Sequence, residues 1–239
     1  MRRGEDANKG GAIRTLAFLA LFLAAPAWAA PFGLQVGDLR LGFDLPAGFT
    51  DSTPTGSPRL IELAESFTAA SNRILVFALT DADMRRFNAG DAPDLRQYLL
   101  VVTPRALEHQ RTPLGEFDGN VREMLRSLGK PPPEGDFAKY LETRPPGEAT
   151  YLGELRREPE VVAVLRGVRL PPAETGFFSF SFFSKPSQYV LSSTTMLLLR
   201  GKSLQLTVVT GYESKADLEW LRATTLRWID ELRRLNASR

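Results

Sequence analysis

The sequence predicts an α+β fold: a mainly antiparallel sheet flanked by helices, with the C-terminal helix packed on the sheet. Two observations carry this prediction. Residues 194–210 alternate as a β-hairpin around Gly201, and residues 214–235 carry an apolar stripe at helical spacing. Short apolar runs separated by turn-forming residues recur through the rest of the chain, as is typical of antiparallel strands.

Residues 1–29 have the layout of a secretory signal peptide. Basic residues near the N-terminus precede an uninterrupted apolar run from Thr15 to Ala25, and Ala27-Trp28-Ala29 provides a small-x-small cleavage site. We expect cleavage after Ala29 and a bacterial protein of the periplasm, or a secreted one. The alternative is an uncleaved anchor in the inner membrane, but the apolar region is shorter than the ~20 residues that span a bilayer.

Composition excludes several classes of function. The full chain has 30 basic and 28 acidic residues. The leader holds four basic and two acidic residues, so the mature chain has 26 basic and 26 acidic residues. A zero net charge provides no bulk attraction to nucleic acid, and we expect no such partner. The absence of cysteine excludes disulfides, thiolate metal sites, thiol nucleophiles and lipoprotein anchoring.

Residues 30–239 are expected to form a single α+β domain that begins with short strands. An entry strand or hairpin is predicted over 34–41 and ends before Pro46. Residues 59–64 and 73–79, separated by polar residues, are typical of an antiparallel pair of strands.

A short helix, a strand and a longer helix are predicted next. Asp81 is a suitable cap for a helix that ends near Asn88, and the β-branched residues before Pro104 favour a strand over 98–103. Thr112 followed by Pro113 predicts the start of a helix that ends at Gly129, because apolar residues recur at helical spacing between them.

Residues 129–148 are rich in proline and predict an exposed connection with one turn of helix inside it. A ligand for a polyproline-binding module is the alternative, and a rigid spacer is the commoner use of such a segment. Residues 149–155 and 161–168 then predict a second hairpin.

Phe178, Phe180 and Phe182 occupy one face of a predicted strand over 177–183. They are the one candidate for an apolar binding surface, either for a lipid-like ligand or for another envelope protein. The alternative is that they form the inner face of the sheet, which the alternation of Phe and Ser favours. Exposure of the same residues would allow peripheral attachment to a membrane.

The hairpin over 194–210 is expected to turn at Gly201-Lys202 in a type II′ conformation, which favours glycine at the first central position. The resulting register pairs Leu199 with Leu204, Leu197 with Leu206 and Thr195 with Val208. Its apolar face has to be covered, and the C-terminal helix, capped by Ser214 and Asp217, carries the matching stripe. The stripe consists of Leu218, Leu221, Thr225, Trp228, Leu232 and Leu235.

No catalytic, cofactor-binding or metal-binding residue can be assigned from the sequence. His109 is the one histidine and has no partner at metal-ligand spacing. The serines at 179, 181, 192 and 193 lie on predicted strands without a nucleophile motif. The remaining route to catalysis is a pair of carboxylates brought together by folding, either Asp81 with Asp83 or a pair from Glu154, Glu158 and Glu160.

The run Phe43-Asp44-Leu45-Pro46-Ala47-Gly48-Phe49, the antiparallel strands and the closing Trp-containing helix resemble the PsbP-like family of envelope and lumenal proteins. The resemblance implies an α/β/α sandwich and a role as an accessory or assembly factor without a shared catalytic site. Trp220, Trp228 and Asn236 are also similar to those of uncharacterised proteobacterial secreted proteins.

These observations favour a non-enzymatic binding or envelope-assembly accessory protein that uses no cofactor. Its expected partner is an envelope protein or an apolar ligand. The alternatives are a periplasmic hydrolase with a carboxylate-based site and a protein attached peripherally to the membrane.

Overall fold

The computed structural model describes residues 31–133, 136–171 and 188–237. Its strands are β1 (Phe32–Val36), β2 (Leu39–Phe43), β3 (Phe49–Asp51), β4 (Asn72–Thr80), β5 (Gln97–Pro104), β6 (Ala149–Glu158), β7 (Val161–Arg169), β8 (Tyr189–Leu199) and β9 (Lys202–Tyr212). Its helices are α2 (Pro58–Ser66), α3 (Asp81–Asn88), α4 (Leu114–Leu128), α5 (Phe137–Glu142) and α6 (Lys215–Asn236), with 3-10 turns η2 (Thr53–Thr55) and η3 (Arg105–Leu107).

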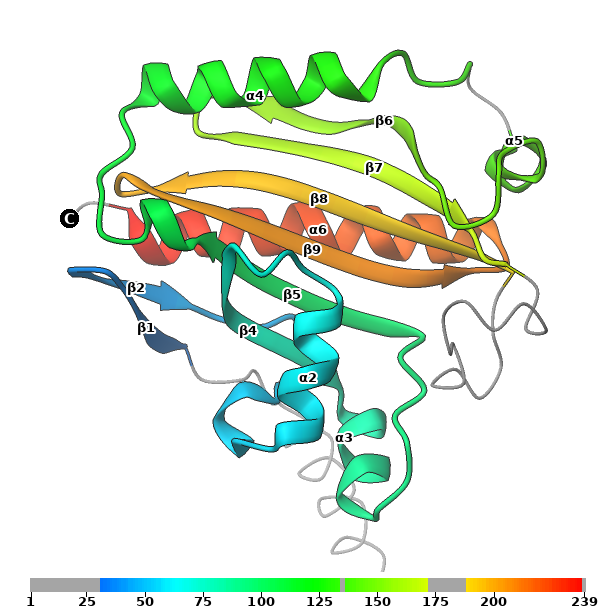
Figure 1. Cartoon of the computed structure of the whole chain (residues 1–239), viewed down its shortest axis with the longest axis horizontal. Coiled ribbons are helices and arrows are strands. Elements are labelled where there is room, and N and C mark those ends of the chain that lie inside the picture. Colours follow the sequence, from blue (N-terminus) through cyan, green and yellow to red (C-terminus); the bar gives the residue numbers. More distant parts are fainter. Residues whose placement is uncertain (1–30, 134–135, 172–187, 238–239) are drawn as a thin grey trace, which may run out of the picture.

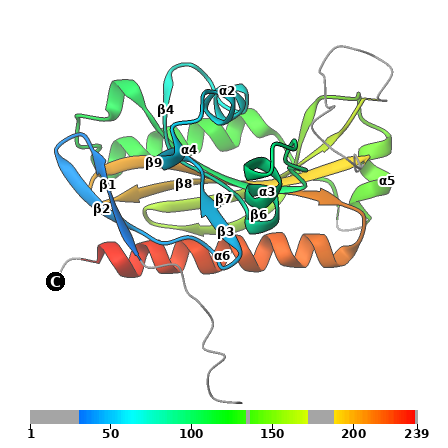
Figure 2. The same ribbon diagram turned by 90° about the horizontal axis from the view of Figure 1, so that it is seen from below.

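The described residues form three layers, in which one large sheet has helices on both of its faces. The seven-stranded sheet has the order β3-β4-β5-β9-β8-β7-β6, and every neighbouring pair is antiparallel. Figures 1 and 2 show α6 on one face of this sheet and α2 and α4 on the other. The α+β class, with helices on both faces of an antiparallel sheet and the C-terminal helix packed on it, is therefore confirmed.

Each face of the sheet has its own apolar core. Under α6 the core includes Leu221, Trp228 and Leu232 together with the inward residues of the central strands and of the β1–β2 hairpin. On the opposite face α2 covers the β4–β5 end of the sheet, and α4 covers the end formed by β6, β7 and β8. The two helices on that face thus bury separate clusters, because each lies over a different end of the sheet.

The β8–β9 hairpin has the predicted apolar face but a different turn. Arg200 and Gly201, both at positive φ (51° and 84°), form the centre of the turn, as in type I′. Leu199 therefore pairs with Lys202, and the predicted register is wrong by two residues. The observed pairs that replace the predicted ones are Leu197 with Leu204 and Thr195 with Leu206. A shift of two residues keeps every side chain on the same face, so the leucines remain in the core.

The prediction of a strand over 59–64 is wrong, because these residues lie in α2. Pro58 occupies the first turn of the helix and the extended Ser57 precedes it, which is a favourable helix start. Leu60, Leu63 and Ala64 are buried at helical spacing. The apolar residues alone favour a strand here, whereas the Ser57-Pro58 pair favours the helix that is observed.

Helix α6 is held at both ends. At its start, the Ser214 N–H donates to Asp217 Oδ2 at 2.9 Å, which completes the predicted capping box. At its end, the Asn236 side chain accepts from Gly42 N–H at 2.9 Å and donates to Gly42 C=O at 2.8 Å. The helix is thereby tied to β2 as well as to the sheet that it covers.

The observed starts of α3 and α4 each differ by one residue from the start predicted from the sequence. Thr80, not Asp81, caps α3, since its hydroxyl oxygen accepts from Asp83 N–H at 3.1 Å. Helix α4 begins at Leu114, so Pro113 is its cap residue rather than its first residue. The end of α4 at Gly129 is as predicted.

The proline-rich connection contains the predicted turn of helix, α5. Its Leu141 is fully buried against β7, where it packs over Gly167. A Cβ on Gly167 would lie 2.9 Å from side-chain carbons of Leu141 and Leu152, so a larger residue would require these two leucine side chains to move. The connection is anchored to the sheet here.

Candidate functional site

A pocket of about 460 Å³ lies between α2 and the first half of β4. This size is within the range of ligand-binding pockets, roughly 300–1,000 Å³. Leu60, Ala64, Ile74 and Phe77 provide its apolar surface. We call it the α2–β4 pocket; its other lining residues are Ser52, Thr53, Ile61, Glu65, Thr68, Ala69, Ala70, Asn72, Arg73 and Arg105.

The local sequence explains why this space is left open. Helix α2 turns Leu60 and Ala64 towards the sheet, and alanine at 64 fills little of the gap. The segment that leads from α2 to β4 contributes Thr68, Ala69 and Ala70, which are also small. A chain with large residues at these positions would close the pocket.

An exposed apolar residue marks the wall of the pocket. Ile61 is 45% exposed and is, with Leu114 on α4, one of two large hydrophobic residues exposed in the described part of the chain. Scattered exposed apolar residues are common, but Ile61 lies directly on a cavity lined by Leu60 and Phe77. A ligand in the pocket would cover it.

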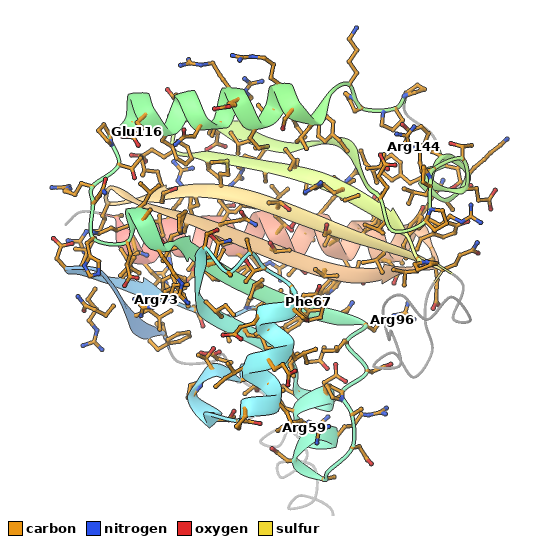
Figure 3. All side chains as sticks on the ribbon, viewed as in Figure 1. Arg59, Phe67, Arg73, Arg96, Glu116 and Arg144 are labelled. Atoms are coloured by element: carbon orange, nitrogen blue, oxygen red, sulfur yellow. The ribbon has the colours of Figure 1, made fainter. Side chains whose placement is uncertain are left out.

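Aromatic rings support the floor of the pocket. Phe67, at the end of α2, stacks on Tyr98 with ring centroids 4.6 Å apart, and both lie about 6 Å from the ring of Phe77. Burial raises the pKa of the Tyr98 phenol far above its usual value, which keeps the ring neutral. Figure 3 shows Phe67 at the end of α2, in front of the sheet.

Two arginines lie on the polar side of the pocket. Arg73 forms an ion pair with Glu108 and donates to the backbone C=O of Gln35 at 3.3 Å. It therefore lies beside the β1–β2 hairpin, as Figure 3 shows. Arg105 donates from Nε to the C=O groups of Ala70 and Asn72, at 3.3 and 3.1 Å. The protein holds both guanidinium groups in place, and Arg105, which has no carboxylate partner in the described residues, is the one that favours binding of an anion.

A buried lysine binds the segment that carries Glu108, the ion-pair partner of Arg73. Lys202 is 1% exposed, and its Nζ donates to the C=O groups of Glu108 and Gln110 at 3.0 and 3.1 Å. The same nitrogen lies 2.7 Å from the carboxylate of Asp38 in the β1–β2 turn. This hydrogen bond lowers the pKa of Asp38. Glu108 thus links the pocket to the tip of the β8–β9 hairpin.

None of the residues singled out in the sequence is among the described residues that line the α2–β4 pocket. Phe178, Phe180 and Phe182, with the serines at 179 and 181, are outside the described residues. His109 is exposed. Ser193 is fully buried, with its Oγ 2.6 Å from that of Thr225, so this serine joins the sheet to α6 and does not reach solvent.

The candidate carboxylates are divided between two ends of the molecule. Asp81 and Asp83 belong to α3, where each accepts a hydrogen bond from a threonine hydroxyl. Glu154 and Glu158 belong to β6, at the far edge of the sheet from β3, and pair with arginines. Glu160 follows β6 and is exposed. The two sets lie apart in the fold, and a catalytic pair within either set stays a prediction.

Two further structural findings concern metals and membranes. Within the three described ranges, no group of three or more His, Asp or Glu side chains is placed to hold a metal ion. None of the helices in the same ranges is long and apolar enough to cross a bilayer.

Comparison with known proteins provides no family for the chain. No protein-family model matches it, and no curated protein matches it significantly. The function has to be argued from the α2–β4 pocket.

Proposed function

We propose that the chain is an exported binding or assembly accessory protein of the bacterial envelope, and that its ligand site is the α2–β4 pocket. The observation that carries the proposal is an open cavity of about 460 Å³ with an apolar floor and an exposed Ile61 on its wall. Export is proposed from the leader at residues 1–29. The accessory role is also what the PsbP-like resemblance implies.

The expected ligand is a small apolar molecule. Ile61 and Ile74, the lining side chains that keep exposed apolar surface, can release water, and each buried methylene of a ligand is worth about 0.8 kcal/mol. The binding groups are fixed by α2 and β4, so little ordering is needed when the ligand enters.

A residue that fills the pocket should abolish binding. We expect the purified mature protein to bind the neutral apolar dye Nile red with an increase in fluorescence, and Ala69→Trp to weaken this binding at least about tenfold by occupying the cavity. Ala69 is exposed on the rim, so the change does not enter the core. Ala223→Trp, on the exposed side of α6, is the matched control and should bind as the unmodified protein does.

Two outcomes would count against the pocket as the site. One is the absence of dye binding to the unmodified protein, and the other is an equal affinity of the Ala69 and Ala223 variants. Export is tested separately: after osmotic shock of the bacterial host, we expect the protein in the soluble periplasmic fraction with Ala30 at its N-terminus. Recovery in the membrane fraction with an intact leader would contradict it.

A further inference from the structure

We infer that the ligand of the α2–β4 pocket is a single-chain amphiphile with an anionic head group, its apolar chain inside the pocket and its head group at Arg105. The inference rests on the proposed function and adds the sign of the charge that the site selects. It follows from the hydrogen bonding of the two arginines and from the position of the single acidic residue among the lining residues.

Arg105 is the better of the two cations for a ligand. Its Nε is occupied by the C=O groups of Ala70 and Asn72, two lining residues of the pocket, so the guanidinium lies against the pocket rim. Within the described part of the chain, no carboxylate forms an ion pair with Arg105 and no acceptor bonds its terminal nitrogens. These nitrogens carry four N–H donors in a planar arrangement that fits a carboxylate or a phosphate.

Arg73 has a supporting role. Glu108 neutralises its charge, and the side chain also donates to the C=O of Gln35. The pair Arg73–Glu108 therefore contributes a dipole and a rigid wall, and Arg105 is the one cation of the described lining without a carboxylate partner. Its position beside a cavity floored by Leu60 and Phe77 combines one anion-binding group with one apolar chain-binding surface.

Glu65 is the opposing charge. It lies on α2 in the lining of the same pocket, is exposed, and has no arginine or lysine within ion-pair distance in the described residues. A carboxylate there repels an anionic ligand and attracts a cationic one. Substitution of Arg105 and of Glu65 should therefore change anion affinity in opposite directions, a result that a loss of folding cannot imitate.

The head group can be a carboxylate or a phosphate, and the inference is for a free amphiphile, although a membrane lipid carries the same anionic group. Both sources present the same chemistry to Arg105. Monomeric dodecanoate and vesicles of phosphatidylglycerol separate them, since only the former can enter the pocket without leaving a bilayer.

The test is displacement of Nile red from the purified mature protein by three amphiphiles with a twelve-carbon chain. They are the anion dodecanoate, the cation dodecyltrimethylammonium and the neutral dodecyl maltoside, each used below its micellar concentration. We expect dodecanoate to bind about tenfold more tightly than the cation. Arg105→Gln should weaken dodecanoate binding about tenfold and Glu65→Gln should strengthen it about twofold, with dodecyl maltoside unchanged in both. Arg126→Gln, on the exposed side of α4, removes the same charge elsewhere and should change nothing.

The outcomes separate the inference from the function on which it rests. Equal displacement by all three amphiphiles, unaffected by Arg105→Gln and Glu65→Gln, would overturn the anion preference and leave an apolar pocket. Failure of every amphiphile and of the dye would overturn both. If Arg105→Gln did not fold, the gain for Glu65→Gln would still be required. Transfer of the protein to phosphatidylglycerol vesicles without binding of monomeric dodecanoate would place the anionic group on the membrane and contradict a free amphiphile in the pocket.

Discussion

Replacement of Trp228 by alanine should lower the free energy of unfolding by about 4 kcal/mol, the largest effect expected for any single substitution considered for this protein. Trp228 lies in α6 and is 3% exposed. Its ring fills the core between α6 and the sheet, and its Nε1–H donates to the backbone C=O of Asp44 at 2.8 Å. Alanine would leave a cavity and an unsatisfied carbonyl group at the same place.

Urea unfolding followed by circular dichroism measures this loss. Trp228→Phe is the control, because phenylalanine keeps most of the buried area but loses the hydrogen bond and part of the ring; its cost should be about 1–2 kcal/mol. If the alanine variant were as stable as the phenylalanine variant, the ring would not be filling a core, and the packing of α6 on the sheet would be wrong.

Replacement of Lys202 by methionine should lower the free energy of unfolding by about 3 kcal/mol. Methionine has a similar length but no donor, so the C=O groups of Glu108 and Gln110 would lose their hydrogen bonds in a place where water is largely excluded. The tips of the β1–β2 and β8–β9 hairpins would no longer be joined. Asp38→Asn is the matched control and should have a smaller effect, since Asp38 is exposed and both carbonyl contacts remain.

The effect of the Lys202 substitution should depend on pH. The hydrogen bond from Lys202 holds the pKa of Asp38 below its value in the unfolded chain. The stability that this contact provides is therefore present above the unfolded pKa and is lost as the pH falls through the lowered, folded pKa. We expect the difference between the unmodified protein and Lys202→Met to narrow in acid. A difference that stayed constant down to the acid transition would show that Asp38 does not interact with Lys202.

The apolar pattern predicted the sheet better than it predicted the turns. Which side chains of β8 and β9 face the core depends only on alternation, and Leu197, Leu204 and Leu206 are buried as expected. The register depends on which two residues occupy the turn, and both Arg200-Gly201 and Gly201-Lys202 place a glycine in it. The type I′ turn at Arg200 requires a positive φ in a residue with a side chain, which sequence alone does not favour.

The pocket could not be predicted from the sequence. Its walls come from the consecutive elements η2, α2 and β4 together with Arg105 of η3, and the apolar pattern of α2 favours a strand rather than the helix that forms the wall. A strand over 59–64 would have put Leu60 and Ala64 on one sheet face, with no helix to form a wall. The Ser57-Pro58 start was the available indication of α2, and Arg105 gave none, because its role depends on a turn that the fold brings beside it.

The central claim is that an apolar chain enters the α2–β4 pocket, and the most direct test is an NMR measurement of contacts between protonated dodecanoate and the deuterated, methyl-labelled protein. We predict intermolecular contacts from the dodecanoate chain to the methyl groups of Ile61, Ile74 and Ala64, which line the pocket. Contacts confined to other methyl groups, such as those of Ile229 on the buried side of α6, would contradict the claim.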